Sequence, residues 1–324
     1  MLEEHDINYQ PTNPEIWQGR WDGDTADLLR WHQVIKLLDI RRTAELQGAV
    51  VFLGFCCDEG VRRNQGRCGA KDAPDYLRSV LAGLPVHFPS TVKLVDAGNI
   101  ICQQEAMESA QSMLSQCVEF LIRSQAFPIV IGGGHEITYG HFKGIQKARS
   151  GKTGIINLDA HLDMRALSNN QGNSGTSFYQ IAEEAEQQQE EFHYLAIGVQ
   201  DISNSMALFN YAASKSVQII KASDIHAENL KNVLVQILRF AQQVDQLYLT
   251  IDLDVFNAAV APGVSALAFN GIFPDHSFQK LFNTILDLPN LVSVDVAELN
   301  PLMDIDHRTA KLAADLLFKI VQKR

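Results

Sequence analysis

Apolar runs of strand length recur along the chain from residue 49 onward, and polar or turn-forming residues separate them. Eight such runs are present, at residues 49–55, 92–95, 127–131, 154–158, 192–197, 217–220, 247–253 and 291–296. Short apolar runs bounded by turn residues are typical of strands that are buried on both faces. We therefore expect a sheet of about eight strands.

Amphipathic helical patterns lie between several of these runs. Apolar residues recur at helical spacing within residues 106–121, 230–241 and 312–321. Strands that alternate with such helices predict an α/β fold, a three-layer αβα sandwich with a mainly parallel sheet. Residues 1–45 lack this alternation. We expect them to form an N-terminal arm, with a short helix near residues 28–40, packed on a single domain over residues 46–324.

Composition narrows the classes of partner. The 324 residues carry a formal net charge of −11, with 46% hydrophobic and 20% charged residues. Nucleic acids and anionic membrane surfaces are disfavoured because both need a basic face. The N-terminus does not resemble a secretory signal, no apolar run approaches membrane-spanning length, and the five cysteines contain no CxxC pair. We expect a cytoplasmic protein with reduced thiols that acts on a small molecule.

Two short acidic segments directly follow apolar runs. Residues 159–163 read Asp-Ala-His-Leu-Asp and residues 252–254 read Asp-Leu-Asp, so their ionisable side chains share one face of an extended chain. A helix cap or an acidic turn accounts for one such acid but not for the alternating set. His135 follows three glycines after another run, and by itself it is equally compatible with a structural role.

These segments predict a dinuclear metal site. The candidate ligands are His135, Asp159, His161, Asp163, Asp252 and Asp254. Four carboxylates gathered without cations would repel by about 4 kcal/mol per close pair at an effective dielectric near 20, so we expect two divalent ions among them. Oxygen-rich ligation with two imidazoles and no thiolate favours Mn²⁺ over structural zinc. Hydrolysis by an activated water is the natural reaction class.

A further acid, Glu298, stands just past the run at residues 291–296. Ligands bind beyond the carboxyl ends of the strands in such sheets. The Glu298 carboxylate could hold a planar nitrogen cation through two parallel hydrogen bonds, although an acid near a helix N-terminus explains the local sequence equally well.

Together these segments resemble the ureohydrolase superfamily of arginases, agmatinases and formimidoylglutamases, from about residue 50 to the C-terminus. The resemblance implies an arginase-like fold, a homo-oligomer and two Mn²⁺ per subunit. It assigns His135, Asp159, Asp163 and Asp252 to one ion, and Asp159, His161, Asp252 and Asp254 to the other. It also implies that Asp163 hydrogen-bonds a bridging hydroxide and that Glu298 receives the amidinium or guanidinium end of the substrate.

Three segments look like the formimidoylglutamase pattern within this superfamily, at residues 54–67, 198–204 and 261–265. Where arginases and agmatinases carry a histidine after the metal block, this chain has Asn173 and Ser174 in the segment Asn-Ser-Gly-Thr. The proton-shuttle role suggested for that histidine therefore cannot be carried over, and Asp163 becomes the expected proton carrier.

Arg165 supports the same branch on physical grounds. A guanidinium binds carboxylates bidentately, and formimidoylglutamate carries two of them. We therefore expect Mn²⁺-dependent hydrolysis of N-formimidoyl-L-glutamate to L-glutamate and formamide, in histidine degradation, by attack of a metal-bridging hydroxide. The expected substrate-binding residues are Arg165, Asn173, Ser174, Glu298 and Arg67. Arg62, Arg63 and Arg67 could instead form surface ion pairs.

Three alternative functions stay open. A guanidino hydrolase of the agmatinase, guanidinobutyrase or arginase type would use the same metal ligands. A binuclear phosphoesterase also uses Asp and His clusters, but its Gly-Asn-His segment with a following acid is missing from the sequence. The third alternative is a non-catalytic, metal-binding regulatory protein.

Overall fold

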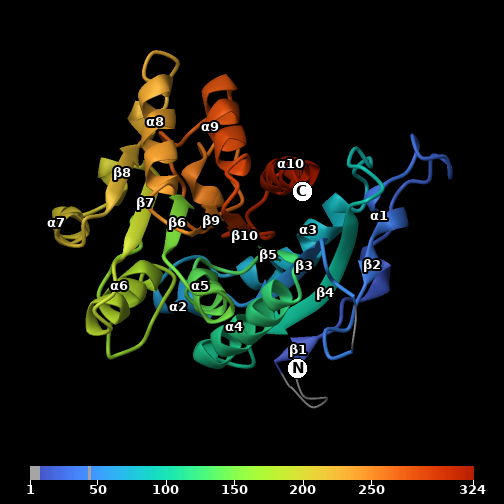
Figure 1. Ribbon diagram of the computed structural model, residues 1–324, viewed down its shortest axis with the longest axis horizontal. Coiled ribbons are helices and arrows are strands. Elements are labelled where there is room, and N and C mark those ends of the chain that lie inside the picture. Colours follow the sequence, from blue (N-terminus) through green and yellow to red (C-terminus); the bar gives the residue numbers. More distant parts are fainter. Residues whose placement is uncertain (1–7, 43–44) are drawn as a thin grey trace.

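The computed structural model describes residues 8–42 and 45–324, which surround one mainly parallel sheet (Figure 1). Within these residues the sheet has ten strands in the order β1-β4-β3-β5-β10-β9-β6-β7-β8, with β2 also paired to β4. Only the β1–β4 pairing is antiparallel. The strands are β1 (Tyr9–Gln10), β2 (Lys36–Leu37), β3 (Ala49–Cys56), β4 (Lys93–Ile101), β5 (Phe127–Ile131), β6 (Thr153–Leu158), β7 (His193–Val199), β8 (Gln218–Lys221), β9 (Gln246–Asp252) and β10 (Leu291–Ala297).

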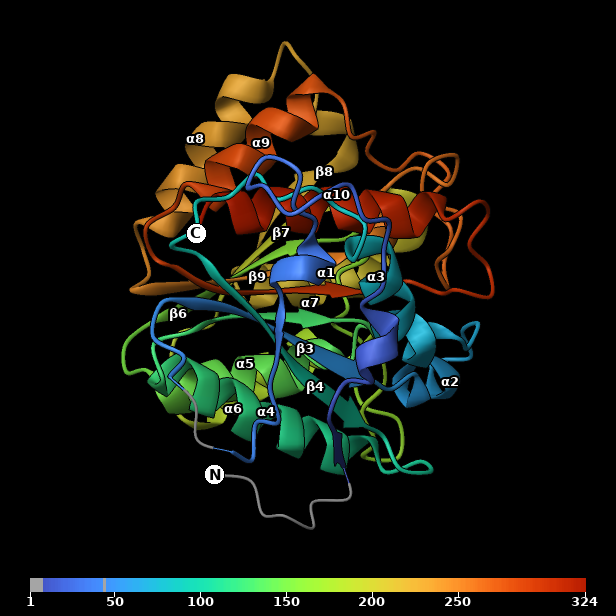
Figure 2. The same ribbon diagram turned by 90° about the vertical axis from the view of Figure 1, so that its right-hand side faces the viewer.

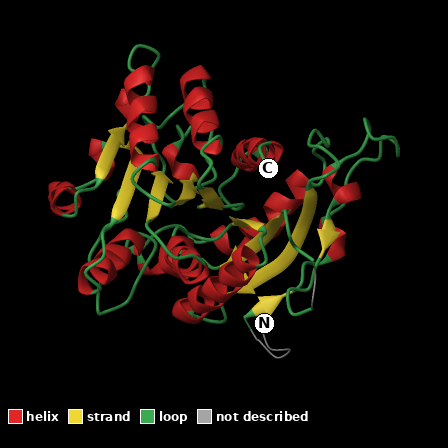
Figure 3. Ribbon diagram, in the orientation of Figure 1, coloured by secondary structure: helices red, strands yellow, loops and turns green. Residues whose placement is uncertain are grey.

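Helices cover both faces of the sheet (Figure 2) and alternate with its strands (Figure 3). One face carries α4 (Met107–Arg123), α5 (Ile137–Ala148) and α6 (Ser177–Gln187). The other carries α3 (Ala73–Leu81), α8 (Leu230–Ala241), α9 (His276–Leu286) and α10 (Arg308–Gln322). Shorter helices are α1 (Trp31–Val34), α2 (Glu59–Arg63) and α7 (Met206–Ser214), and the 3-10 helices are η1 (Pro14–Ile16), η2 (Ala70–Asp72), η3 (Asp201–Ser203), η4 (Ala222–Asp224) and η5 (Leu253–Val255).

The central strands are mostly apolar because both of their faces are buried. In β5, Ile129 and Ile131 pack into the core beneath α8, α9 and α10, whereas Val130 packs beneath α4, α5 and α6. Alternate residues of a strand point to opposite faces, so apolar residues are needed on both faces of β5. The predicted three-layer αβα sandwich is confirmed, and the eight predicted strands are β3 to β10.

The helix predicted near residues 28–40 is wrong over most of its length. Only Trp31–Val34 is helical, and Ile35 is extended with φ −68° and ψ 137°. The chain then adds β2 to the sheet, where Lys36 pairs with Val95 of β4. Tertiary contacts decide this segment, because Trp31 is fully buried beside Phe52 and a longer helix would give up the pairing with β4.

The described part of the N-terminal segment is anchored to the sheet by a buried ion-pair network. Trp17 donates its indole N–H to Asp96 at 2.6 Å, and Thr12 donates its hydroxyl to the same carboxylate at 2.9 Å. The guanidinium of Arg78, fully buried on α3, donates to both oxygens of Asp96. Within the described residues, no helix combines the length and apolar character needed to cross a bilayer.

Candidate metal centre

The predicted ligands lie at the carboxyl ends of four adjacent strands. His135 follows β5 after a turn of three glycines, Asp159 follows β6, Asp252 ends β9, and Glu298 follows β10. In the sheet these strands stand side by side in the order β5-β10-β9-β6. Parallel strands present their carboxyl ends at one edge, so residues far apart in the sequence meet there.

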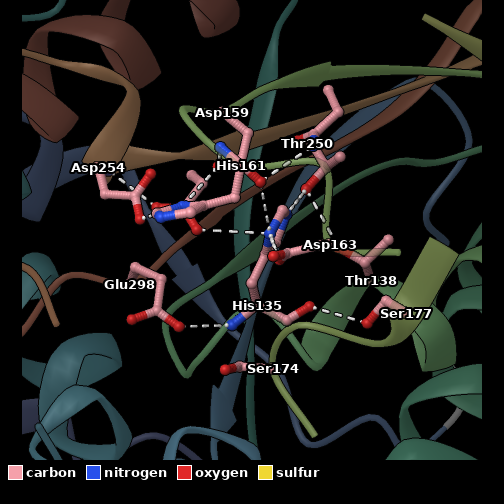
Figure 4. Close-up of polar contacts among 12 residues, drawn as sticks. His135, Thr138, Asp159, His161, Asp163, Ser174, Ser177, Thr250, Asp254 and Glu298 are labelled. Atoms are coloured by element: carbon pink, nitrogen blue, oxygen red, sulfur yellow. Dashed lines mark hydrogen bonds and ion pairs between the residues drawn. The ribbon is translucent and has the colours of Figure 1, made fainter. Parts of the chain in front are cut away.

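Four of the six predicted metal ligands surround one point. The Nδ1 atom of His135 lies 2.8 Å from Asp163 Oδ2, 3.2 Å from Asp159 Oδ2 and 3.4 Å from Asp252 Oδ2 (Figure 4). One ligand atom from each of the four residues falls within 4.8 Å of all the others. This geometry is suited to a single cation held by three carboxylates and one imidazole.

A second group shares one aspartate with the first. The Nδ1 atom of His161 lies 3.1 Å from Asp254 Oδ2 and 3.3 Å from Asp159 Oδ1. Asp159, His161 and Asp254 therefore form a second set of ligand atoms within 4.8 Å of one another. Because Asp159 turns one oxygen toward each set, it stands where a bridging carboxylate would stand between two ions.

Burial and mutual repulsion disfavour the charged form of most acids in the cluster. Burial and the neighbouring carboxylates raise the pKa of Asp163, raise that of Asp252 strongly, and raise that of Asp254 to about 6. Burial opposes the ionisation of Asp159, but hydrogen bonds with His135 and His161 hold its pKa below the usual range. Cations would remove the repulsion that causes the upward shifts.

Two buried carboxylate oxygens near the cluster lack hydrogen-bond partners. Asp254 Oδ1 and Glu298 Oε2 are buried and have no hydrogen-bond partner among the described residues. Buried carboxylate oxygens are normally hydrogen-bonded or bound to a metal. The donor set of four carboxylates and two imidazoles therefore fits a pair of divalent cations, with Glu298 directed to another ligand.

A cavity of about 340 Å³ opens onto this cluster. Glu298 lines it, with Oε1 accepting the backbone N–H of His135 at 2.9 Å and Oε2 unpartnered. Burial and the nearby Glu136 raise the pKa of Glu298 to about 8. Further predicted site residues in the lining are His135, His161, Asp163, Asp252, Asp254, Arg165, Ser174 and Arg67.

Arg165 and Ser174 both line the cavity, but Arg165 is exposed and Ser174 is buried. Arg165 is exposed, and its guanidinium has no acidic partner within the described part of the chain. The Ser174 hydroxyl accepts a hydrogen bond from the Asn64 side chain at 3.0 Å and is mostly buried. Asn173 lies outside the lining, and its side-chain oxygen accepts the backbone N–H of Gly175 at 2.9 Å, as in a turn.

The remaining arginines make contacts within the protein. Arg67 lines the cavity, but its guanidinium donates to the carbonyl oxygens of Val264 at 2.7 Å and Ser265 at 2.9 Å. It thereby joins the loop after β3 to the loop after β9. Arg62 and Arg63 pair with the buried Glu59 at 2.6 and 2.9 Å and are absent from the lining.

Several lining residues were not predicted individually from the sequence. They are Asn64, Gln65, Gly66, Ser203, Asn204, Leu208, Ser265 and Ala266. Asn204 also stabilises the metal block, because its side chain donates to the Ala160 carbonyl and accepts the Leu162 N–H, both at 2.9 Å. Only their position in the sequence could have identified these residues, because their loops follow β3, β7 and β9 at the edge of the sheet where ligands bind.

Comparison with known proteins agrees with this geometry. Residues 48–322 match the model of the Arginase family. The chain is 42% identical to a formimidoylglutamase of Ralstonia nicotianae, covering 95% of each chain, and 39% identical to one of Clostridium tetani, covering 97% and 96%. Trypanosoma cruzi formiminoglutamase with Mn²⁺ superposes with a TM-score of 0.76 at 28% identity, covering 85% of this chain and 92% of that one. The chain therefore belongs to the arginase family.

Proposed function

We propose that this protein is a Mn²⁺-dependent formimidoylglutamase, which hydrolyses N-formimidoyl-L-glutamate to L-glutamate and formamide. The observation that carries the proposal is the meeting of two ligand sets at Asp159, beside a cavity that contains both a buried acid and a free arginine. Relatives of this name align with nearly the whole chain at about 40% identity.

The metal centre would use all six predicted ligands. His135, Asp159, Asp163 and Asp252 would hold one Mn²⁺, and Asp159, His161 and Asp254 the other, as the two groups of ligand atoms in the structure suggest. The family resemblance adds Asp252 to the ligands of the second ion. When bound, a pair of such ions supplies the Lewis acidity that makes water a nucleophile at neutral pH.

Glu298 would orient the reacting end of the substrate. Its Oε2 is buried without a partner in the described structure, and its Oε1 keeps a second lone pair after accepting the His135 N–H. The carboxylate can therefore accept two parallel hydrogen bonds from an amidinium. This contact places the formimidoyl carbon beside the ligand cluster.

Asp163 would move the proton. It lies in the cavity lining next to His135, so one carboxylate can face both the attacking water and the departing nitrogen. Water adds to the formimidoyl carbon, the bond from that carbon to the glutamate nitrogen breaks, and this nitrogen takes up a proton. The products are formamide and glutamate.

Arg165 would select the dicarboxylate. Its guanidinium lacks an acidic partner among the described residues and is exposed at the cavity, so it is available to a substrate carboxylate. The contacts of Arg67 with two carbonyls make it a support for the same rim, with a positive charge that favours the second carboxylate. Ser174 and the turn that contains Asn173 would shape the wall between them. A cationic substrate such as agmatine would meet the wrong charge here.

A substrate panel tests the assignment. Metal-free protein is reconstituted with Mn²⁺ and assayed with formimidoylglutamate, arginine, agmatine, guanidinobutyrate and a phosphate ester, and formamide, urea and phosphate are measured. We expect formamide from formimidoylglutamate and no appreciable product from the others. Urea from arginine with no formamide would refute the substrate, and metal loading without any hydrolysis would favour a regulatory protein.

We further infer a homo-oligomer in the cytoplasm, with residues 1–45 as an arm on a single domain over 46–324. Cys56, Cys57, Cys68 and Cys102 form no disulfide in the described structure, which supports a reducing compartment. Large apolar side chains such as Ile202 (90% exposed) and Phe269 (82% exposed) are available for subunit contacts. Light scattering in solution and fractionation of cells test these two inferences, and a monomer or a membrane-bound protein would overturn them.

A further inference from the structure

The segment that carries three of the predicted metal ligands is held by the chain that follows β7. Strands β6 and β7 pair in parallel as far as Leu158 and Ile197. Beyond them the Asp159 N–H donates to the Ile197 carbonyl at 2.9 Å. The Gln200 N–H then donates to the Ala160 carbonyl at 3.0 Å. The ligand segment therefore begins as an extension of the sheet.

A side chain interrupts this pairing at the next step. In a regular parallel ladder, Gln200 would bond residue 160 through its N–H and residue 162 through its carbonyl, with His161 opposite it. Instead the carboxamide of Asn204 lies between Leu162 and Gln200. Its Oδ1 accepts the Leu162 N–H at 2.9 Å, and its Nδ2 donates to the Gln200 carbonyl at 2.8 Å. The amide of the side chain thus takes the place of a peptide group between the two segments.

Asn204 also binds the peptide group on the other side of His161. Its Nδ2 donates a second hydrogen bond, to the Ala160 carbonyl at 2.9 Å. Two carbonyl oxygens and one N–H surround the amide, so its nitrogen and oxygen can be placed in only one way. Both of its protons are used within the protein, and the residue is only 8% exposed. Asn204 therefore has no N–H left to donate to a substrate.

The backbone on both sides of His161 matters because the imidazole itself is not enclosed. His161 Nδ1 lies 3.3 Å from Asp159 Oδ1 and 3.1 Å from Asp254 Oδ2 (Figure 4). Its side chain is 24% exposed and lines the cavity. Packing around the ring alone therefore does not hold it toward the two acids. The direction of the side chain depends on the backbone that Asn204 holds.

Asp163, which belongs to the other ligand set, has separate supports. The Leu162 carbonyl accepts the Tyr194 hydroxyl at 3.2 Å, and the Asp163 carbonyl accepts the Phe178 N–H at 3.2 Å. Asp163 has φ +46°, a left-handed conformation that residues other than glycine keep only where their surroundings hold them. These two contacts do not involve Asn204. The first ligand set can therefore stay in place without that amide.

We propose that Asn204 is a positioning residue for the ion held by Asp159, His161 and Asp254, and that it acts by fixing the backbone on both sides of His161. The proposal rests on the metal centre of the proposed function and does not depend on the substrate. It predicts that the two ions differ in their dependence on Asn204.

The test is a Mn²⁺ titration of metal-free protein, followed by the electron paramagnetic resonance signal of free Mn²⁺. Asn204→Ala removes all three hydrogen bonds of the amide. We expect the affinity of one of the two sites to fall about 10- to 100-fold, the usual result of losing a group that orients a metal ligand. The other site should stay within twofold of wild type. Asn204→Leu, which keeps the size of the side chain, should give the same result.

The variant His161→Ala identifies the weakened site, because His161 belongs only to the second ligand set. This variant should keep one tightly bound ion. Adding Asn204→Ala should leave the affinity for that ion within twofold, because the side chain that Asn204 positions is already gone. Further weakening of the remaining ion would show that Asn204 supports the whole centre, which contradicts the proposal.

Asn229→Ala is the matched control. The Asn229 amide likewise donates to a backbone carbonyl, that of Asp224 at 2.9 Å, in the loop after β8 and outside the cavity lining. Both Mn²⁺ affinities should stay within twofold of wild type in this variant. Thermal unfolding in EDTA identifies variants that do not fold. If Asn204→Ala is one of them, Asn204→Leu carries the test, and a failure of both to fold would overturn a role specific to one ion.

Two further results would overturn the inference. One is unchanged Mn²⁺ affinity at both sites in folded Asn204→Ala, and the other is an equal loss at both sites. A failure of the proposed substrate would appear differently, as normal Mn²⁺ binding with no formamide released.

Discussion

The Glu298 carboxylate accepts the backbone N–H of His135 at 2.9 Å, across the ends of the neighbouring strands β10 and β5. One oxygen of this acid thereby holds the glycine-rich turn that carries a predicted metal ligand, while the other is buried without a partner in the described structure. Under the proposed function, Glu298 would both position the turn that carries His135 and bind the substrate, and substitutions can separate these two roles.

The change Glu298→Gln keeps an oxygen for the His135 N–H and removes the negative charge. We expect kcat/KM for formimidoylglutamate to fall about 10- to 100-fold, the usual effect of losing a charged hydrogen-bond partner. Bound Mn²⁺, measured by elemental analysis, should stay at the wild-type level. Glu105→Gln, at an exposed acid, is the control. Wild-type kinetics in Glu298→Gln would remove this residue from the substrate site.

The change Arg165→Ala should weaken binding of substrates that carry carboxylates and should not weaken binding of substrates that lack them. Loss of a bidentate contact should raise the KM for formimidoylglutamate about tenfold or more. Any residual turnover of agmatine, which has no carboxylate, should stay the same or rise. Arg62→Ala is a matched control, because Arg62 pairs with Glu59 outside the cavity. Equal loss on both substrates would contradict a role in selecting the dicarboxylate.

The change His161→Ala should remove one of the two Mn²⁺ ions and leave the other bound. His161 contacts Asp159 and Asp254 but belongs only to the second ligand set. The protein should therefore bind about one Mn²⁺ per subunit in place of two, as counted by elemental analysis after dialysis. His226→Ala, at an exposed histidine, serves for comparison. Two tightly held ions in His161→Ala would show that the second set is wrongly assigned.

The turn before His135 requires glycine for steric reasons as well as for its backbone angle. Gly133 has φ +78°, and a Cβ there would lie 2.7 Å from the Phe55 carbonyl oxygen. Gly48 has φ +71°, but a Cβ there would meet nothing within 4 Å. Gly48→Ala should cost about 1 kcal/mol of unfolding free energy, and Gly133→Ala should cost more and also weaken Mn²⁺ binding. Equal losses of unfolding free energy in Gly48→Ala and Gly133→Ala, measured by denaturant unfolding, would contradict the steric argument for Gly133.

The stability of the metal-free protein should depend on pH in an unusual direction. Burial raises the pKa of Asp254 to about 6, of Glu136 to about 7 and of Glu298 to about 8. The folded state therefore holds protons that the unfolded chain has already lost, and its stability should fall as pH rises from about 4.5 to 8. Bound Mn²⁺ should reverse this trend, because ligation requires deprotonated groups.

Thermal unfolding between pH 5 and 8 checks this dependence. In EDTA the midpoint should decrease as pH rises, by about 2 °C for each kcal/mol lost in a chain of this length. With saturating Mn²⁺ the midpoint should increase over the same range. A metal-free midpoint that rises with pH would mean that the acids are paired with protein groups already.

The strands and the metal ligands could be predicted from the sequence for a local reason. Strands buried on both faces can be apolar along their whole length, as in β3 and β5, and their ends are marked where polar residues begin. The expected extended chain does not continue over the acidic segments, because Asp254 lies in η5 and residues 159–163 lie in the loop after β6. Their residue types and their position directly after a strand were the local signals that identified them as candidate ligands.

Contacts between distant segments decided the rest. Nothing near Trp31 indicates that the chain will leave its helix to join β4, and nothing near Asn173 indicates that its side chain will close a turn outside the cavity. His135 Nε2 and Thr250 Oγ1 lie 2.9 Å apart only because packing brings the turn after β5 close to β9. The candidate ligands of the centre can thus be named from the sequence, because their residue types and spacing are local features. Their positions relative to one another depend on tertiary packing, because His135, Asp159 and Asp252 meet only where β5, β6 and β9 end at one edge of the sheet.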